Sequence, residues 1–85
     1  MSPEIAFGQV LREIRQSFKI SQEKLALDSG YHRTYISLLE RGEKSPTLTT
    51  IYNLSRTLGV KPSTMIERIE ELVDPSSFKL QKEKP

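Results

Sequence analysis

Apolar residues recur at three- and four-residue steps along most of this chain, and no stretch shows the two-residue alternation of a half-buried strand. Glycine and proline divide this helical pattern into short segments. The sequence therefore predicts a compact all-α domain with five helices. The first runs over residues 3–17. The second runs from a cap at 21 to a stop at 30, and the third over 32–41. The fourth runs from a cap at 47 to a stop at 59, and the fifth from 62 to before 75.

The predicted helix ends carry residues suited to them. Ser2, Ser21 and Thr47 can accept a hydrogen bond from a free backbone N–H of the first turn, as helix N-caps do. Gly30 and Gly59 can adopt the positive φ that often ends a helix. The side chains expected to face the core are Leu25 and Ala26 in the second helix, Ile36 and Leu39 in the third, and Leu48, Ile51, Leu54 and Leu58 in the fourth.

The 85 residues suffice for one small domain, without room for a catalytic domain beside a binding domain. We expect a domain over residues 1–74 and a flexible polar tail over 75–85. With no cysteine and one histidine, neither a disulfide nor a metal site is expected. The apolar runs are too short to cross a membrane and the N-terminus lacks the layout of a signal peptide, so we expect a cytoplasmic protein.

The net charge of +2 is too small to indicate nucleic acid by itself, but the distribution of charge is informative. Residues 1–61 hold nine Lys and Arg against six Asp and Glu, whereas residues 62–74 hold one against four. This asymmetry favours a protein with one face toward phosphates and another toward a different partner.

The second and third predicted helices are short and are joined by a tight turn at Gly30. This is the pattern of a helix-turn-helix, whose second helix lies in the DNA major groove. The outward face of that helix is short and chemically mixed, with arginine for guanine, hydroxyls that donate or accept, and an apolar side chain for the thymine methyl. It comprises Thr34, Ser37, Leu38 and Arg41, with Arg33 at its side.

Several ordered motifs resemble the phage-repressor-like, or Xre, helix-turn-helix family. They are Ile20–Ala26, Ser29–Ser37, Glu40-Arg41-Gly42, Ser45–Leu48 and Leu58–Ser63. The resemblance covers about residues 5–73 and implies a five-helix, lambda-repressor-like DNA-binding domain with the helix-turn-helix at helices 2–3. The stretch from Arg33 to Ser37 and the small size are also similar to the controller proteins of restriction–modification systems.

The resemblance implies a set of DNA-contacting residues: Gln22, His32, Arg33, Thr34, Tyr35, Ser37, Leu38, Arg41 and Lys44. Arg33, Thr34 and Leu38 would face base edges, with His32 and Ser37 adjacent. Gln22 would bind a phosphate and brace a recognition side chain. Arg41 and Lys44 would bind phosphates beyond the recognition helix. Tyr35 would contact the sugar-phosphate backbone or bases. Leu38 is open to a second reading, as an exposed leucine without a function.

Two further positions carry structural implications from the same resemblance. Arg15 and Glu40 match a family pair that forms an internal salt bridge between the first and third helices. Lys19 stands where the family usually has a glycine that closes the first helix in the left-handed conformation. Lysine can adopt this conformation at a cost of about 1 kcal/mol relative to glycine.

The fifth predicted helix carries apolar residues over more than one narrow stripe: Met65, Ile66, Ile69, Leu72 and Val73. Packing within the domain could use all of them, but an end helix has few neighbours to cover so wide a face. We therefore expect a homodimer joined through this helix. An isologous dimer would set two recognition helices about 34–36 Å apart, matched to a palindromic operator in double-stranded DNA.

The predicted function is sequence-specific transcription regulation, by promoter occupancy or by contact with RNA polymerase, with the concentration of the protein setting the response. An alternative is a protein-interaction module such as an antitoxin, which would bind a partner protein and, secondarily, DNA. An enzyme is not expected, because the sequence has no nucleophile–base set, phosphate-cradling glycine loop or metal-spaced acidic cluster. Neither a cofactor nor a small-molecule ligand is expected.

Overall fold

Five helices follow one another along residues 1–73, the part of the chain that the computed structural model describes. They are α1 (Pro3–Ser17), α2 (Gln22–Ser29), α3 (Arg33–Glu40), α4 (Leu48–Leu58) and α5 (Pro62–Leu72). No strand occurs within these residues, so the predicted all-α class is confirmed. The predicted tail over residues 75–85 lies outside the described residues. Among helices α1 to α5, none has both the length and the apolar character needed to span a bilayer.

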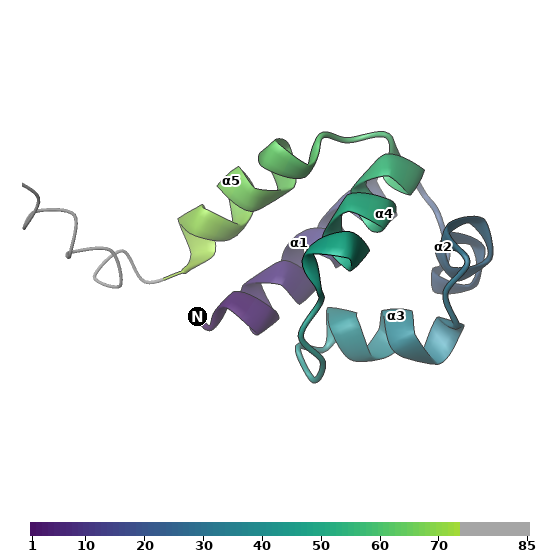
Figure 1. Ribbon diagram of the computed structural model, residues 1–85, viewed down its shortest axis with the longest axis horizontal. Coiled ribbons are helices and arrows are strands. Elements are labelled where there is room, and N and C mark those ends of the chain that lie inside the picture. The colour runs from purple at the N-terminus through teal and green to yellow at the C-terminus, as the bar shows by residue number, and fades with distance from the viewer. Residues whose placement is uncertain (74–85) are drawn as a thin grey trace, which may run out of the picture.

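The main contacts between the helices form a ring. Helix α1 packs against α3 and α5, α4 packs against α2 and α5, and α2 packs against α3. Figure 1 shows α3 at one edge of the molecule and the connection between α4 and α5 at the opposite edge. The helix-turn-helix of α2 and α3 therefore lies away from α5, which leaves these two parts free to serve different partners.

The helix ends form as the local sequence predicts. Ser2, Ser21 and Thr47 each accept a backbone N–H from their own first turn, at 3.2, 2.9 and 3.0 Å. Lys19 has a φ of 59°, so it adopts the left-handed conformation in which the family's glycine usually closes the first helix. Helix α3 is one residue shorter at each end than predicted, because His32 is its N-cap and the residue after Glu40 its C-cap.

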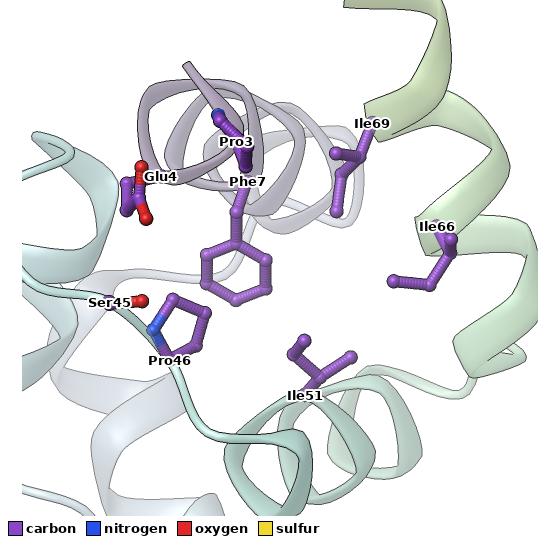
Figure 2. A pocket seen from close by; sticks show the side chains of 8 residues that line it. All are labelled: Pro3, Glu4, Phe7, Ser45, Pro46, Ile51, Ile66 and Ile69. Atoms are coloured by element: carbon purple, nitrogen blue, oxygen red, sulfur yellow. The ribbon is translucent and has the colours of Figure 1, made fainter. Parts of the chain in front are cut away.

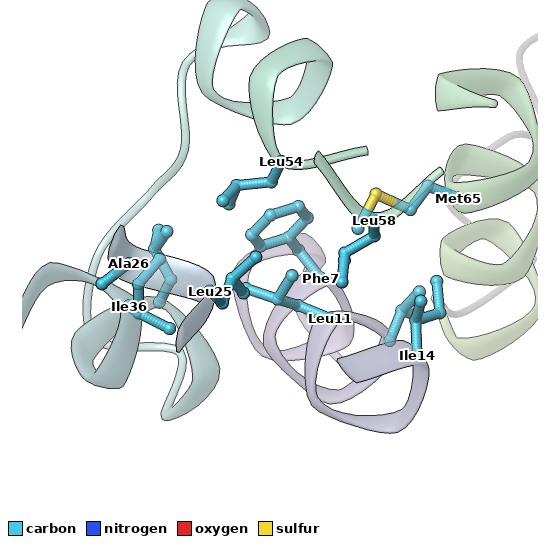
Figure 3. Packing of buried hydrophobic residues seen from close by; sticks show 11 residues of the cluster. Phe7, Leu11, Ile14, Leu25, Ala26, Ile36, Leu54, Leu58 and Met65 are labelled. Atoms are coloured by element: carbon cyan, nitrogen blue, oxygen red, sulfur yellow. The ribbon is translucent and has the colours of Figure 1, made fainter. Parts of the chain in front are cut away.

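The core joins one face of every helix. Figure 3 shows Phe7, Leu11 and Ile14 of α1 directed toward side chains from the other four helices. The expected inward positions of α2 and α3 are confirmed, as are Leu54 and Leu58 of α4. Leu48 differs from the prediction, since it is 69% exposed. Ser55, seven residues later on the same side of α4, is fully buried, so the position around the helix does not explain this exposure; Leu48 is the first residue of α4, where the neighbouring helices leave it uncovered.

Helix α5 also packs more of its apolar residues inward than the sequence predicts. Met65 is fully buried and Val73 is 8% exposed, so neither side chain is available to a second subunit as expected. The reason for Met65 is that α5 closes the core over α1 and α4, and this side chain belongs to the core cluster. Ile66 remains 38% exposed, while Ile69 and Leu72 are half-buried.

A buried ion pair joins α1 to α3, as the resemblance implies. The Arg15 guanidinium donates through Nε to Glu40 Oε2 at 2.6 Å and through Nη2 to Oε1 at 3.0 Å. Its Nη1 donates to the backbone carbonyl of Ile20 at 2.7 Å. The Glu40 side chain is fully buried and that of Arg15 is nearly so. This one arginine therefore links α1, α3 and the turn that leads into α2.

Helix α1 approaches the end of α3 closely at Gly8. A Cβ atom added there would lie 2.6 Å from the carbonyl oxygen of Glu40, and closer still to that of Leu39. Both atoms belong to backbone, which cannot rotate away as a side chain can. The absence of a side chain at Gly8 thus sets the distance at which the ion pair forms.

We expect Gly8→Ala to destabilise the fold by about 1–3 kcal/mol, because the helices must separate. The intrinsic helix preference of alanine, worth about 1 kcal/mol over glycine, acts in the opposite direction. Urea unfolding measures the difference. Gln16→Ala on the exposed side of the same helix is the control, with an expected change within about 0.5 kcal/mol. Equal stability of the two variants would contradict the close contact.

Removal of the buried arginine should cost more. Arg15→Ala leaves Glu40 buried with only Gln22 and the more distant Arg12 beside it, so we expect a loss of about 3 kcal/mol in the free energy of unfolding. Lys24→Ala, which breaks the exposed pair with Asp28, is the control and should cost less than about 0.5 kcal/mol. Similar losses in the two variants would show that the buried pair does not stabilise the fold.

Candidate nucleic-acid interface

Helix α3 divides lengthwise into a buried face and an outward face. Ile36 and Leu39 are fully buried on the core side. The predicted base-facing and adjacent side chains lie on the other side: Arg33, Thr34, Ser37 and Leu38. The first two are exposed and the last two are half-buried. Two turns of helix thus present a guanidinium, two hydroxyls and an aliphatic group side by side.

The start of α3 is held against α4 by two tyrosines. The Tyr35 hydroxyl hydrogen-bonds the Thr50 hydroxyl at 3.1 Å, and the Tyr31 hydroxyl accepts from the Asn53 amide at 3.1 Å. Their ring centroids lie 5.2 Å apart. Tyr35 is half-buried, so this predicted DNA-contacting residue also has a structural contact. His32 is exposed at the N-cap position, and its side chain makes no capping hydrogen bond.

Gln22, at the start of α2, faces the buried ion pair. Its amide Nε2 donates to Glu40 Oε1 at 2.9 Å. The side chain of α3 that Gln22 holds in place is therefore Glu40. The amide group carries a second hydrogen that this bond does not use. Arg12 of α1 reaches the same oxygen, with its Nε 3.6 Å from Oε1. Arg12 is a residue that the sequence pattern did not single out, although its three-residue spacing from Arg15 sets the two on one helix face.

Two basic residues follow the end of α3. Arg41 is its C-cap and Lys44 lies in the connection to α4, and both side chains are exposed. The Arg41 Nε lies 3.3 Å from Glu43 Oε2. Both members of this pair are about half exposed, so the attraction is weak and a phosphate could replace the glutamate. The predicted phosphate-binding residues thus flank the outward face at the C-terminal end of α3.

Comparison with known proteins identifies the family of this chain. A helix-turn-helix family model matches residues 11–65. The control protein C.BamHI of Bacillus amyloliquefaciens is 45% identical over 64 residues, which cover 74% of this chain and 79% of that protein.

Solved structures give the same result. The restriction–modification controller protein C.AhdI from Aeromonas hydrophila superposes with a TM-score of 0.70 and 39% identity, covering 72% of this chain and 92% of that one. The controller protein C.Esp1396I was solved as a tetramer with its natural 35-base-pair operator. It superposes with a TM-score of 0.76 and 27% identity, covering 84% of this chain and 93% of that one. The chain therefore belongs to the Xre-like helix-turn-helix family and is a DNA-binding transcriptional regulator similar to restriction–modification controller proteins.

Proposed function

We propose that this protein binds a palindromic operator as a homodimer, with α3 of each subunit in the major groove. The observation that carries the proposal is the outward face of α3, where exposed polar groups cover a helix whose other side is locked into the core. A helix of 8 residues fits a groove about 12 Å wide, and its side chains reach the base edges.

Each side chain on this face has a distinct chemical use in the groove. Arg33 can donate two parallel hydrogen bonds to O6 and N7 of guanine, and the Thr34 hydroxyl can donate or accept. Leu38 can cover a thymine methyl group. Gln22 and the basic residues Arg41 and Lys44, which lie at either side, would bind backbone phosphates and set the register of α3 on the duplex.

The homodimer rests on an apolar face that α4 and α5 share. Ile66 is partly exposed on α5, and Leu48 and Tyr52 are 69% and 50% exposed on α4. Beside these helices lies a shallow groove of about 190 Å³, lined by Ile51, Ile66 and Ile69 together with residues of α1 and of the connection before α4 (Figure 2). That volume is below the range of about 300–1,000 Å³ usual for small-molecule sites. A second copy of the chain fits this face better than a ligand does.

Similarity to operator-binding proteins supports the same function. C.Esp1396I binds its operator as a tetramer, and C.BamHI is a control protein. A homodimer that fills its operator as its own concentration rises would regulate transcription without a small-molecule signal. An isologous arrangement repeats one half-site in each strand, which is why we propose a palindromic sequence.

Arg33→Ala should weaken operator binding by about 1–3 kcal/mol and relax the preference at one or two base positions. Lys44→Ala is the matched control, because it removes one positive charge that we assign to a phosphate. It should weaken binding to all sequences alike. Selection of bound sequences from a random pool, followed by affinity measurements on single-base variants, tests both. A uniform loss for Arg33→Ala would make it a phosphate contact.

Ile66→Glu should convert the dimer to a monomer, because a carboxylate in the apolar interface would lose its hydration. Loss of the second half-site should lower operator affinity by roughly 100-fold or more. Sedimentation equilibrium gives the mass. Leu27→Glu is the control, since Leu27 is 77% exposed on α2, away from this face. An unchanged mass for Ile66→Glu would exclude the interface, and a monomeric wild type would leave the face to a different partner protein.

A further inference from the structure

One positive charge beside the buried ion pair is left without a hydrogen-bond partner. Glu40 is bonded by both Arg15 nitrogens and by Gln22, so its two oxygens already accept three hydrogen bonds. Arg12 Nε lies 3.6 Å from Oε1, beyond hydrogen-bond range. Within residues 1–73 Arg12 makes no hydrogen bond, and its side chain is half exposed. Two guanidiniums thus meet one carboxylate, and the surplus charge lies at the surface.

A second hydrogen-bond donor, the Gln22 amide, lies near this surplus charge. Gln22 Nε2 and Arg12 Nε approach the same oxygen atom, so the two groups lie side by side. The remaining amide hydrogen of Gln22 and the donors of Arg12 are free for one acceptor group. The fork of N–H groups on a guanidinium matches the oxygens of a phosphate.

We propose that Arg12 and Gln22 together bind one phosphate of the DNA backbone, and that Glu40 holds both side chains in position for it. The inference rests on the proposed DNA binding and adds an α1 residue to the contact surface. Arg12 reads no base, because it lies on α1 beside the start of α2 and not on the outward face of α3. Its contribution is therefore equal for every DNA sequence.

A purely structural role for Arg12 makes a different prediction. If the residue served only as a second counter-charge for Glu40, its removal would lower stability and leave the salt dependence of DNA binding unchanged. The geometry disfavours that role, since Arg15 alone gives Glu40 two hydrogen bonds and is itself almost fully buried. Arg12 is farther away and faces solvent.

Arg12→Gln, measured on the full chain, separates the two roles. One released counterion contributes a slope of about 0.9 in a plot of log affinity against log salt. The proposed dimer carries two copies of Arg12, so we expect the slope to fall by about 1.8, and affinity near 0.1 M salt to fall roughly 60-fold for operator and random duplexes alike. Arg12→Lys should keep the slope. Thermal unfolding of the three proteins should coincide within a few degrees.

The control is Lys61→Gln, which removes the same charge at the connection between α4 and α5, the edge of the molecule opposite α3 (Figure 1). It should leave the slope as in the wild type, with dimerisation checked in parallel. The proposed phosphate contact would be overturned if Arg12→Gln kept the wild-type slope, or if Lys61→Gln lowered the slope equally. Neither result would contradict DNA binding itself. If the wild-type protein bound neither the operator nor a random duplex, both this inference and the proposed function would be overturned.

Discussion

The buried carboxylate of Glu40 is the interaction on which the placement of the other parts depends. A carboxylate in the interior is unfavourable unless its charge and its hydrogen-bond capacity are both satisfied. Here Arg15 from α1 and Gln22 from α2 satisfy it, and Arg15 also bonds the turn between those helices. Because all these contacts converge on the last residue of α3, they fix the C-terminal end of that helix relative to α1 and α2.

The other end of α3 is fixed by a different set of contacts. The hydroxyls of Tyr35 and Thr50 are hydrogen-bonded, and Thr50 bonds in turn to the N-cap Thr47 of α4. At the C-terminal end, the close approach at Gly8 prevents α3 from shifting toward α1. A helix held at both ends and along one face can present its remaining face in a single orientation. Recognition of base edges requires such rigidity, since hydrogen bonds in the groove tolerate little displacement.

Helix α5 belongs both to the core of the domain and to the face that we propose for dimerisation. Met65 completes the core that α1 and α4 begin, so α5 is an integral part of the fold. The same helix leaves Ile66 partly exposed, and Tyr52 of α4 is also half exposed. A chain of this size buries a limited fraction of its surface, and a second subunit over this face would add apolar burial. DNA contact and self-association can therefore occupy separate surfaces.

The sequence by itself determined the helices, their caps and the outward face of α3, because these follow from short-range hydrogen bonding and from the 3.6-residue period. The pair of Arg15 with Glu40 followed from resemblance to a family. Only the tertiary structure decided that Leu48 faces solvent, that Met65 belongs to the core, and that Arg12 lies beside Gln22. Periodicity gives the direction of a side chain on its own helix, whereas its burial and its partners depend on which other helix packs there.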